Sequence, residues 1–158
     1  MNVLLSVKPE YAEKIVEGTK KYEFRRSIFK KNDIDKVYIY SSSPVSKIIG
    51  SFEIENILKD SPEMIWNLCQ KYAGISKKNF FSYFINSNMA YAIEIGDIDR
   101  FKEPIDPYHI IENFKPPQSF YYVPTNYLQS QWDAQDNELV KPAISTESMQ
   151  GISFMRHL

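Results

Sequence analysis

The sequence predicts an α+β fold, a small mixed β-barrel with flanking helices, and two observations support this prediction. Segments with strand and helix patterns follow one another in the order strand, helix, strand, strand, strand, two helices and strand, an order that suits few parallel crossovers. The chain has 158 residues, 43% of them hydrophobic, which is enough for one compact domain with a core and too little for two. We expect this domain to span residues 1–123. An irregular carboxy-terminal extension, packed or partly mobile, is expected over residues 124–158, where GISFM is a candidate for an extra strand.

The amino-terminal residues are predicted to form a strand followed by a helix. Residues 2–7 are mostly apolar, as in a buried strand. In the next segment, four residues recur at helical spacing: Tyr11, Ala12, Ile15 and Val16. Gly18 is the natural end of this helix, because glycine readily adopts the left-handed conformation that commonly closes a helix.

The charged stretch KKYEFRR, residues 20–26, is predicted to form a strand with one buried face. Tyr22 and Phe24 point to one side and Glu23 and Arg25 to the other, since successive side chains of a strand alternate. We therefore expect the charges on the face opposite to the buried one. The two charged residues lie about 6.5 to 7 Å apart along the strand, close enough for their side chains to form an ion pair.

The middle of the chain is predicted to add two strands, two helices and a last main strand. Residues 36–42 and 47–57 have the β-branched and aromatic content of strands, and the last main strand covers residues 90–101. A Ser-Pro start at Ser61 opens the first helix, and Ser76 is the expected N-cap of the second. The apolar face expected for the first helix consists of Met64, Ile65, Leu68 and Tyr72. The proline-rich segment after the last main strand is expected to wrap around the sheet.

Composition and charge limit the classes of function. The net charge of -1 gives no overall electrostatic argument for nucleic acid, so any basic site must be local. The single cysteine, Cys69, excludes an internal disulfide, and two histidines far apart in sequence leave little for a metal cluster, so we expect neither a metal nor a cofactor. The apolar run VLLSV is too short for a signal peptide or a membrane span. We therefore expect no targeting segment, no membrane partner and a cytoplasmic setting.

Positive charge is nevertheless concentrated in one window of the chain. Residues 14–36 contain eight lysines or arginines against four acidic residues. Tyr22, Phe24 and Phe29 are interleaved with them, and this combination is what phosphate contact and base stacking need. The same charges also suit an ordinary solvated strand face, so the residues alone leave both interpretations open.

One motif within this window resembles a known family. Gly18, Lys20, Glu23 and Arg25 spell G-x-K-x-x-E-x-R, the signature of the ASCH domain, a branch of the PUA-like superfamily. The later segments VYIYSSSPVSKIIGSFEI, KYAGISKKNFFSYF and AYAIEI also resemble that domain in the expected order, so that the resemblance covers residues 2–122. It implies a small PUA-like β-barrel with a cleft lined by the motif, in a superfamily associated with RNA binding and with recognition of modified bases.

We therefore predict a nucleic-acid-binding module, with RNA as the preferred partner and the cleft holding a base. Gly18 ends the helix and presents Lys20 near the mouth of the barrel, where the lysine can meet a phosphate or a carbonyl oxygen. Lys20 and Glu23 have opposite strand parity, so their joint action requires a bulge or a turn near Lys20. The candidate binding residues are Gly18, Lys20, Lys21, Glu23, Arg25, Arg26, Lys30, Lys31, Ser41 and Ser42. A stacking platform and a place in the core remain alternatives for the aromatic cluster Phe120, Tyr121 and Tyr122.

The alternative to a binding module is an enzyme, a small hydrolase acting on RNA or on a modified nucleoside such as N4-acylcytidine, with Lys20 and Glu23 as acid and base groups. The resemblance implies this alternative, because some ASCH relatives are amidohydrolases that use a lysine, a threonine and a glutamate, and others have been linked to RNA cleavage. This chain departs from the amidohydrolase pattern: Glu23 occupies the threonine position, and no carboxylate lies between Glu63 and Glu94. An interaction protein whose extension carries the contact is a third interpretation.

Overall fold

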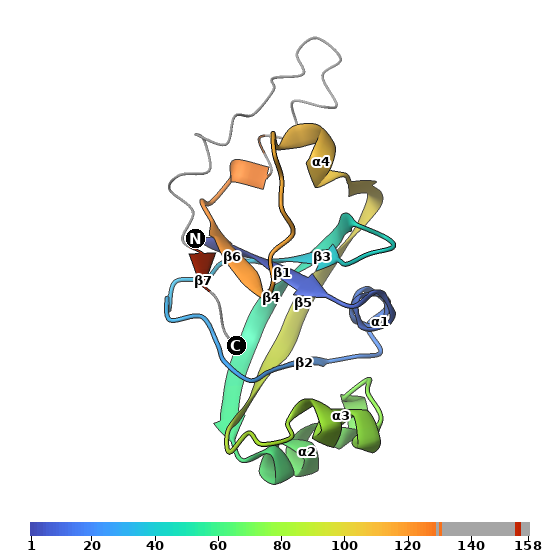
Figure 1. Cartoon of the computed structure of the whole chain (residues 1–158), viewed down its shortest axis with the longest axis vertical. Coiled ribbons are helices and arrows are strands. Elements are labelled where there is room, and N and C mark those ends of the chain that lie inside the picture. Colours follow the sequence, from blue (N-terminus) through green and yellow to red (C-terminus); the bar gives the residue numbers. More distant parts are fainter. Residues whose placement is uncertain (129, 131–153, 156–158) are drawn as a thin grey trace.

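The computed structural model describes residues 1–128, 130 and 154–155 of the chain. Its elements, shown in Figure 1, are in chain order β1 (Asn2–Val7), α1 (Pro9–Glu17), β2 (Tyr22–Arg25), β3 (Val37–Ser41), β4 (Lys47–Asp60), α2 (Pro62–Cys69), the 3-10 helix η1 (Gln70–Tyr72), α3 (Lys77–Tyr83), β5 (Ala90–Ile105), α4 (Pro107–Ile110), β6 (Phe120–Val123) and β7 (Phe154–Met155). As far as β5, the strands and helices follow the predicted order.

The strands form one mixed sheet in the order β2-β5-β4-β3-β1-β6-β7. β1 and β3 pair in parallel, with Val3 opposite Val37, and the other neighbouring strands pair antiparallel. The sheet curls, but β2 and β7 lie at its two edges, so it forms an open half-barrel (Figure 1). The predicted α+β class with a mixed, barrel-like sheet is confirmed, although strand pairing does not close the barrel in the part of the chain that is described.

β4 and β5 form a long antiparallel ladder. Asp60 pairs with Ala90 at one end and Ile48 with Ile105 at the other, and the register shifts between these ends let the strands bend. α2, η1 and α3 connect the two strands beyond the Asp60 end and lie together at the bottom of Figure 1. This helical layer brings α3 opposite α1 and the start of β2.

Local sequence signals set the helix ends as predicted. α1 ends at Gly18, whose φ of 85° places it in the left-handed region. The hydroxyl oxygens of Ser61 and Ser76 each accept a hydrogen bond from the backbone N–H three residues later, at the starts of α2 and α3. Each cap satisfies a backbone group that the helix itself leaves without a partner. The predicted N-cap at Ser76 and the Ser-Pro start at Ser61 are therefore confirmed.

The buried face of α2 differs from the predicted one. Ile65 and Cys69 are buried in one core cluster with Phe80 of α3, whereas Met64 and Leu68 are exposed. Both pairs are spaced four residues apart, so each forms a stripe along the helix. The prediction was right for Ile65 and wrong for Met64, Leu68 and Tyr72, because periodicity does not tell which of two neighbouring apolar stripes faces the rest of the protein.

The expectation that residues 90–101 form the last main strand was also wrong. After α4, β6 adds to the sheet and pairs antiparallel with β1, with Phe120 opposite Leu5. Phe120, Tyr121 and Tyr122 are buried, so this aromatic cluster belongs to the core and is not a stacking platform. The four residues of β6 are too few for their pattern to separate a strand from an irregular segment.

The predicted extension lies mostly outside the described residues. Leu128 is buried in the core cluster that contains Tyr121, and Phe154–Met155 form β7, which pairs with β6. β7 falls in the GISFM segment that the sequence marks as a candidate strand. Within the described residues, no helix combines the length and the apolar character needed to cross a membrane.

Candidate functional site

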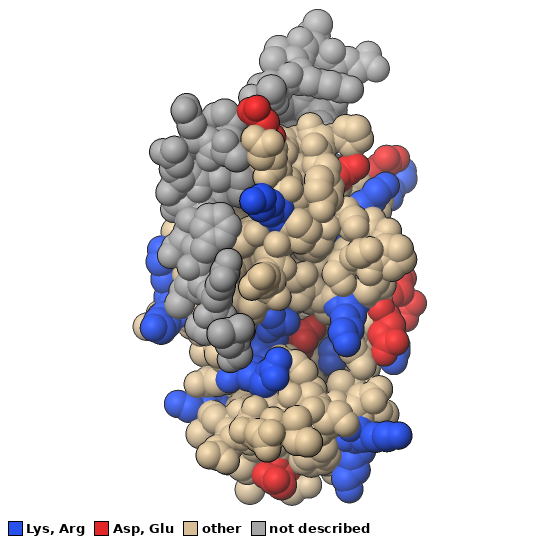
Figure 2. All heavy atoms as spheres, viewed as in Figure 1, with Lys and Arg blue, Asp and Glu red and all other residues tan. Residues whose placement is uncertain are grey.

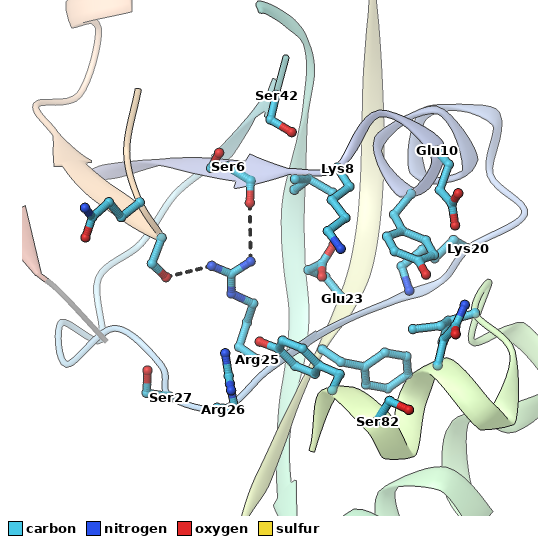
Figure 3. Close-up of a pocket in the computed structure, with 18 residues that line it drawn as sticks. Ser6, Lys8, Glu10, Lys20, Glu23, Arg25, Arg26, Ser27, Ser42 and Ser82 are labelled. Carbon is cyan, nitrogen blue, oxygen red and sulfur yellow. Dashed lines mark hydrogen bonds between the residues drawn. The ribbon is translucent and has the colours of Figure 1, made fainter. Parts of the chain in front are cut away.

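A pocket of about 710 Å³ lies where α1, β1 and β2 face α3. Figure 3 shows its lining side chains, among which the charged ones are Lys8, Glu10, Lys20, Glu23, Arg25 and Arg26. In Figure 2, basic side chains gather around a hollow at mid-height of the molecule, above the α2 and α3 layer. The pocket thus combines a mostly basic rim with two carboxylates.

Lys20 is almost completely buried in the wall of this pocket, with 2% of its surface exposed. Its Nζ donates a hydrogen bond to the backbone carbonyl of Ala73 and lies 4.7 Å from the centre of the Phe24 ring and 5.4 Å from that of Tyr11. Burial lowers the pKa of Lys20 below its usual 10.5, and the nearby carboxylate of Glu23 opposes this shift. The Lys20 amine therefore releases its proton more easily than an exposed lysine does.

The turn between α1 and β2 brings Lys20 into the pocket. The helix ends at Gly18, and β2 begins only at Tyr22. Lys20 therefore precedes the strand, and the alternation of side chains along a strand does not keep it from the side on which Glu23 lies. The predicted turn near Lys20 is confirmed. Gly74 borders Lys20 on the other side: it has φ of 64°, and a Cβ there would lie 2.6 Å from the Cβ of Lys20.

Glu23 is buried as well, with 7% of its surface exposed. Its Oε2 has no hydrogen-bond partner among the described residues. The sequence left two alternatives open for the charged face of β2, a solvated surface and a cleft, and Glu23 lies in a pocket. On one face Phe24 packs against Phe80 of α3, 5.0 Å between ring centres, and on the other Glu23 lines the pocket.

Arg25 connects β2 to the far side of the curled sheet. Its Nη2 donates to the hydroxyl oxygen of Ser119 at 2.6 Å, and its Nη1 donates to the backbone carbonyl of Ser6 at 3.3 Å. These bonds replace the predicted ion pair with Glu23, which the structure does not contain. The curl explains the difference, because it brings β1 and the residue before β6 within reach of the arginine.

Arg26 and Ser42 line the pocket as well, whereas several other predicted residues do not. The guanidinium of Arg26 lies 4.7 Å from the centre of the Tyr83 ring. The predicted binding residues outside the pocket lining are Gly18, Lys21, Lys30, Lys31 and Ser41. Among them, Gly18 ends α1 and forms the turn that precedes Lys20. Ser41 is buried in β3.

The lysines outside the pocket contact other aromatic residues. The Nζ of Lys21 lies 4.3 Å from the centre of the Tyr72 ring, and the Nζ of Lys31 lies 4.8 Å from that of Tyr122. The backbone N–H groups of Lys30 and Lys31 both donate to the Tyr122 hydroxyl. The basic window of the sequence is therefore divided between the pocket and the surfaces around it.

Sequence reasoning missed several lining residues that come from distant segments. They are Ser6, Lys8, Glu10, Tyr11, Asn79, Ser82, Tyr83, Gln118 and Ser119. The basic charge of Lys8, directly after the first strand, was the one local signal for this group. The others are ordinary residue types in their segments, and only the fold brings them to the motif.

Neither a metal cluster nor a reactive thiol stands out in the described residues. No group of three His, Cys, Asp or Glu residues that could hold a metal ion occurs among them. Burial raises the pKa of the Cys69 thiol to about 11, so this cysteine stays protonated near neutral pH. The KYAGIS segment, where an amidohydrolase glutamate would fall, contributes the carbonyl of Ala73 to Lys20 and the side chain of Ile75 to the pocket.

A family model, a curated relative and a crystal structure identify one family. The model of the ASCH domain matches residues 5–99. A Zymomonas mobilis protein named ASCH domain-containing ribonuclease is 31% identical over 122 residues, and the match covers 73% of this chain and 80% of that protein. The crystal structure of ASCH from Zymomonas mobilis has a TM-score of 0.77 and 29% identity to this chain, and the match covers 84% of this chain and 94% of that one.

Proposed function

Because this chain belongs to the ASCH domain family, we propose that it binds single-stranded RNA in the pocket between β2 and α3 and cleaves it there. One observation carries the proposal: a buried lysine of lowered pKa, a buried carboxylate and two arginines share one pocket. The similarity to a protein named a ribonuclease supports RNA as the substrate.

The residues of the pocket suit cleavage by the 2′-hydroxyl of RNA. In this reaction the 2′ oxygen attacks the neighbouring phosphorus, the bond from phosphorus to the 5′ oxygen breaks, and a 2′,3′-cyclic phosphate and a 5′-hydroxyl result. The reaction needs a group that accepts the proton of the 2′-hydroxyl, and a neutral Lys20 amine is such a group. The proton then passes to the leaving 5′ oxygen.

Positive charge beside the phosphate is the second requirement. Lys8, Arg25 and Arg26 all line the pocket, and in Figure 3 Arg25 lies on the opposite side of Glu23 from Lys20. Fixed cations of this kind stabilise the negative charge that develops on the phosphate oxygens in the transition state. Arg25 is held in place by its bonds to Ser6 and Ser119, so it is oriented before the substrate binds.

Substitution of Lys20 by methionine tests the proposal. Methionine is unbranched and of similar length, so it can occupy the narrow space beside Gly74 that the lysine stem fills. We expect Lys20→Met to slow cleavage of a labelled single-stranded oligoribonucleotide by about 100-fold or more. Binding of the same sequence with 2′-O-methyl groups, which cannot react, should change only a few-fold.

Lys21→Met is the matched control, because Lys21 is the next residue, is exposed and lies outside the pocket. The Lys21→Met variant should cleave RNA at the wild-type rate. As a substrate control, an oligomer with a 2′-deoxy residue at the cleavage position should stay intact. Wild-type turnover by a folded Lys20→Met variant would refute the role of the lysine. A 5′-phosphate on the product would refute the 2′-hydroxyl reaction.

Binding without cleavage is the second function that this pocket supports, because its arginines can hold a phosphate without any proton transfer. The same experiment separates the two: tight binding of unmodified RNA that remains intact after prolonged incubation would identify a recognition module. Release of cytidine from N4-acetylcytidine, assayed in parallel, would instead support hydrolysis of a modified nucleoside.

A further inference from the structure

One carboxylate oxygen of Glu23 lacks a hydrogen-bond donor in the described part of the chain. This oxygen is Oε2, and Glu23 lines the pocket and is 7% exposed. The neighbouring cations make their hydrogen bonds elsewhere, Lys20 to the carbonyl of Ala73 and Arg25 to residues of two other segments. A buried polar atom without a partner is unfavourable, so an atom of this kind in a pocket marks the place of a ligand's donor group.

We propose, on the basis of the RNA function proposed above, that Glu23 accepts a hydrogen bond from the exocyclic amino group of one unpaired RNA base. Cytosine, adenine and guanine carry such a group, and carboxylates are suitable acceptors for it. Where cytosine has its amino group, uracil has a carbonyl oxygen, which the carboxylate repels. The pocket therefore discriminates against uracil by leaving two acceptors facing each other.

Aromatic residues of the two neighbouring helices suit the faces of such a base. Tyr11 on α1 and Tyr83 on α3 line the pocket, and both are partly buried. The guanidinium of Arg26 lies 4.7 Å from the centre of the Tyr83 ring. Unpaired bases stack on aromatic rings and on guanidinium planes, so these residues provide surfaces for stacking while Glu23 contacts the base edge.

The position of Glu23 links base recognition to the backbone chemistry. Figure 3 shows Glu23 lying between Arg25 and Lys20 in the pocket. A base held by Glu23 is therefore next to the groups assigned to the phosphate and to proton transfer. Recognition of the amino group would decide which phosphodiester of a single strand is cleaved, and a paired base would be excluded because a base stacked in a duplex cannot enter the pocket.

The test compares four oligoribonucleotides that differ only in the base at the cleavage position. For the wild type, we expect binding of the 2′-O-methyl forms with an amino-bearing base at that position to be about tenfold tighter than binding of the uracil form. In Glu23→Gln the amide can donate as well as accept, so this ratio should fall to about one or reverse. Glu17→Gln, which changes an exposed carboxylate outside the pocket lining, should keep the wild-type ratio.

A change in the ligand tests the same contact without altering the protein. The preferred base is replaced by its analogue that lacks only the amino group, pyrimidin-2-one for cytosine or purine for adenine. The wild type should bind the analogue more weakly than the amino-bearing base, though by a smaller factor than for uracil, because the analogue has no carbonyl oxygen to repel the carboxylate. Glu23→Gln should lose much less affinity.

The outcomes separate this inference from the proposed function. RNA binding and cleavage with equal preference for all four bases would overturn base recognition and leave the RNA function standing. Loss of cleavage in Glu23→Gln for all four bases, with the binding ratios unchanged, would assign Glu23 to proton transfer and also overturn the inference. Absence of any RNA binding by the wild type would remove the RNA function itself.

Discussion

The charged groups of Lys20 and Glu23 differ from the surface charges around them because both are buried in one pocket. Removal from water disfavours the ammonium form of Lys20 and lowers its pKa, while the negative charge of Glu23 favours that form and raises the pKa. A surface lysine is protonated near neutral pH and has no lone pair to accept a proton. Burial is thus the physical reason why this lysine is suited to base chemistry.

A pH profile of cleavage follows from these two influences. If the neutral amine of Lys20 is the active form, kcat/KM should rise with pH, reach half its maximum at the pKa of Lys20, which lies below 10.5, and level off at higher pH. Removing the charge of Glu23 in Glu23→Gln takes away the influence that raises this pKa. The midpoint of the profile should therefore move to lower pH in that variant.

The same profile for Glu10→Gln, whose carboxylate does not contribute to the pKa shift of Lys20, provides the comparison and should keep the wild-type midpoint. A midpoint in Glu23→Gln that stays in place or moves to higher pH would contradict the assignment of the profile to Lys20.

At the scale of elements, two glycines with positive φ shape the surroundings of Lys20. Gly18 closes α1 with φ of 85°, and Gly74 follows η1 with φ of 64°. A Cβ at Gly18 would have no atom within 4 Å, whereas a Cβ at Gly74 would collide with the stem of Lys20. One glycine therefore serves the backbone conformation alone, and the other also makes space for the lysine.

Alanine at each position separates the two effects. Gly18→Ala should lower the free energy of unfolding by about 1 kcal/mol through backbone strain. Gly74→Ala should cost about 1 to 3 kcal/mol more, because overpacking adds to the strain, and it should reduce cleavage by displacing Lys20. Urea unfolding measures the stability of both variants, and their cleavage rates are measured in parallel. Equal losses of stability in the two variants would rule out the proposed contact between Gly74 and the lysine.

At the scale of the whole molecule, Arg25 connects parts of the sheet that strand pairing leaves apart. β2 lies at one edge of the sheet, while β1 and β6 lie near the other. The guanidinium of Arg25 reaches from β2 to the Ser6 carbonyl in β1 and to the hydroxyl of Ser119 just before β6. These side-chain bonds span the open side of the half-barrel, beside the pocket.

Lysine in place of Arg25 should weaken this connection, because an ammonium cannot reproduce the two-pronged geometry of a guanidinium. We expect Arg25→Lys to lower the free energy of unfolding by about 1 to 2 kcal/mol and to weaken RNA binding. Arg26→Lys is the control, since Arg26 is the neighbouring pocket arginine and its described contact is with the Tyr83 ring. Denaturant titrations that give the same stability for both variants would contradict a bridging role for Arg25.

The sequence by itself determined the features that depend on near neighbours. Gly18 ends α1, and Ser61 and Ser76 cap α2 and α3, because a cap needs only the residues of one helical turn. The α+β class and the motif at Lys20 were also readable, since periodicity and spacing are local properties. For the same reason, the turn that brings Lys20 towards Glu23 could be predicted.

Only the tertiary structure decided how the site is assembled. The burial of Glu23, the bonds of Arg25 to Ser6 and Ser119, and the place of Tyr83 all depend on segments far apart in the chain. β6 carries no clear local signal, yet its position next to β1 brings Ser119 to the pocket. Pairing and packing over such separations depend on the curl of the whole sheet. The residue pattern of a single segment therefore cannot predict them.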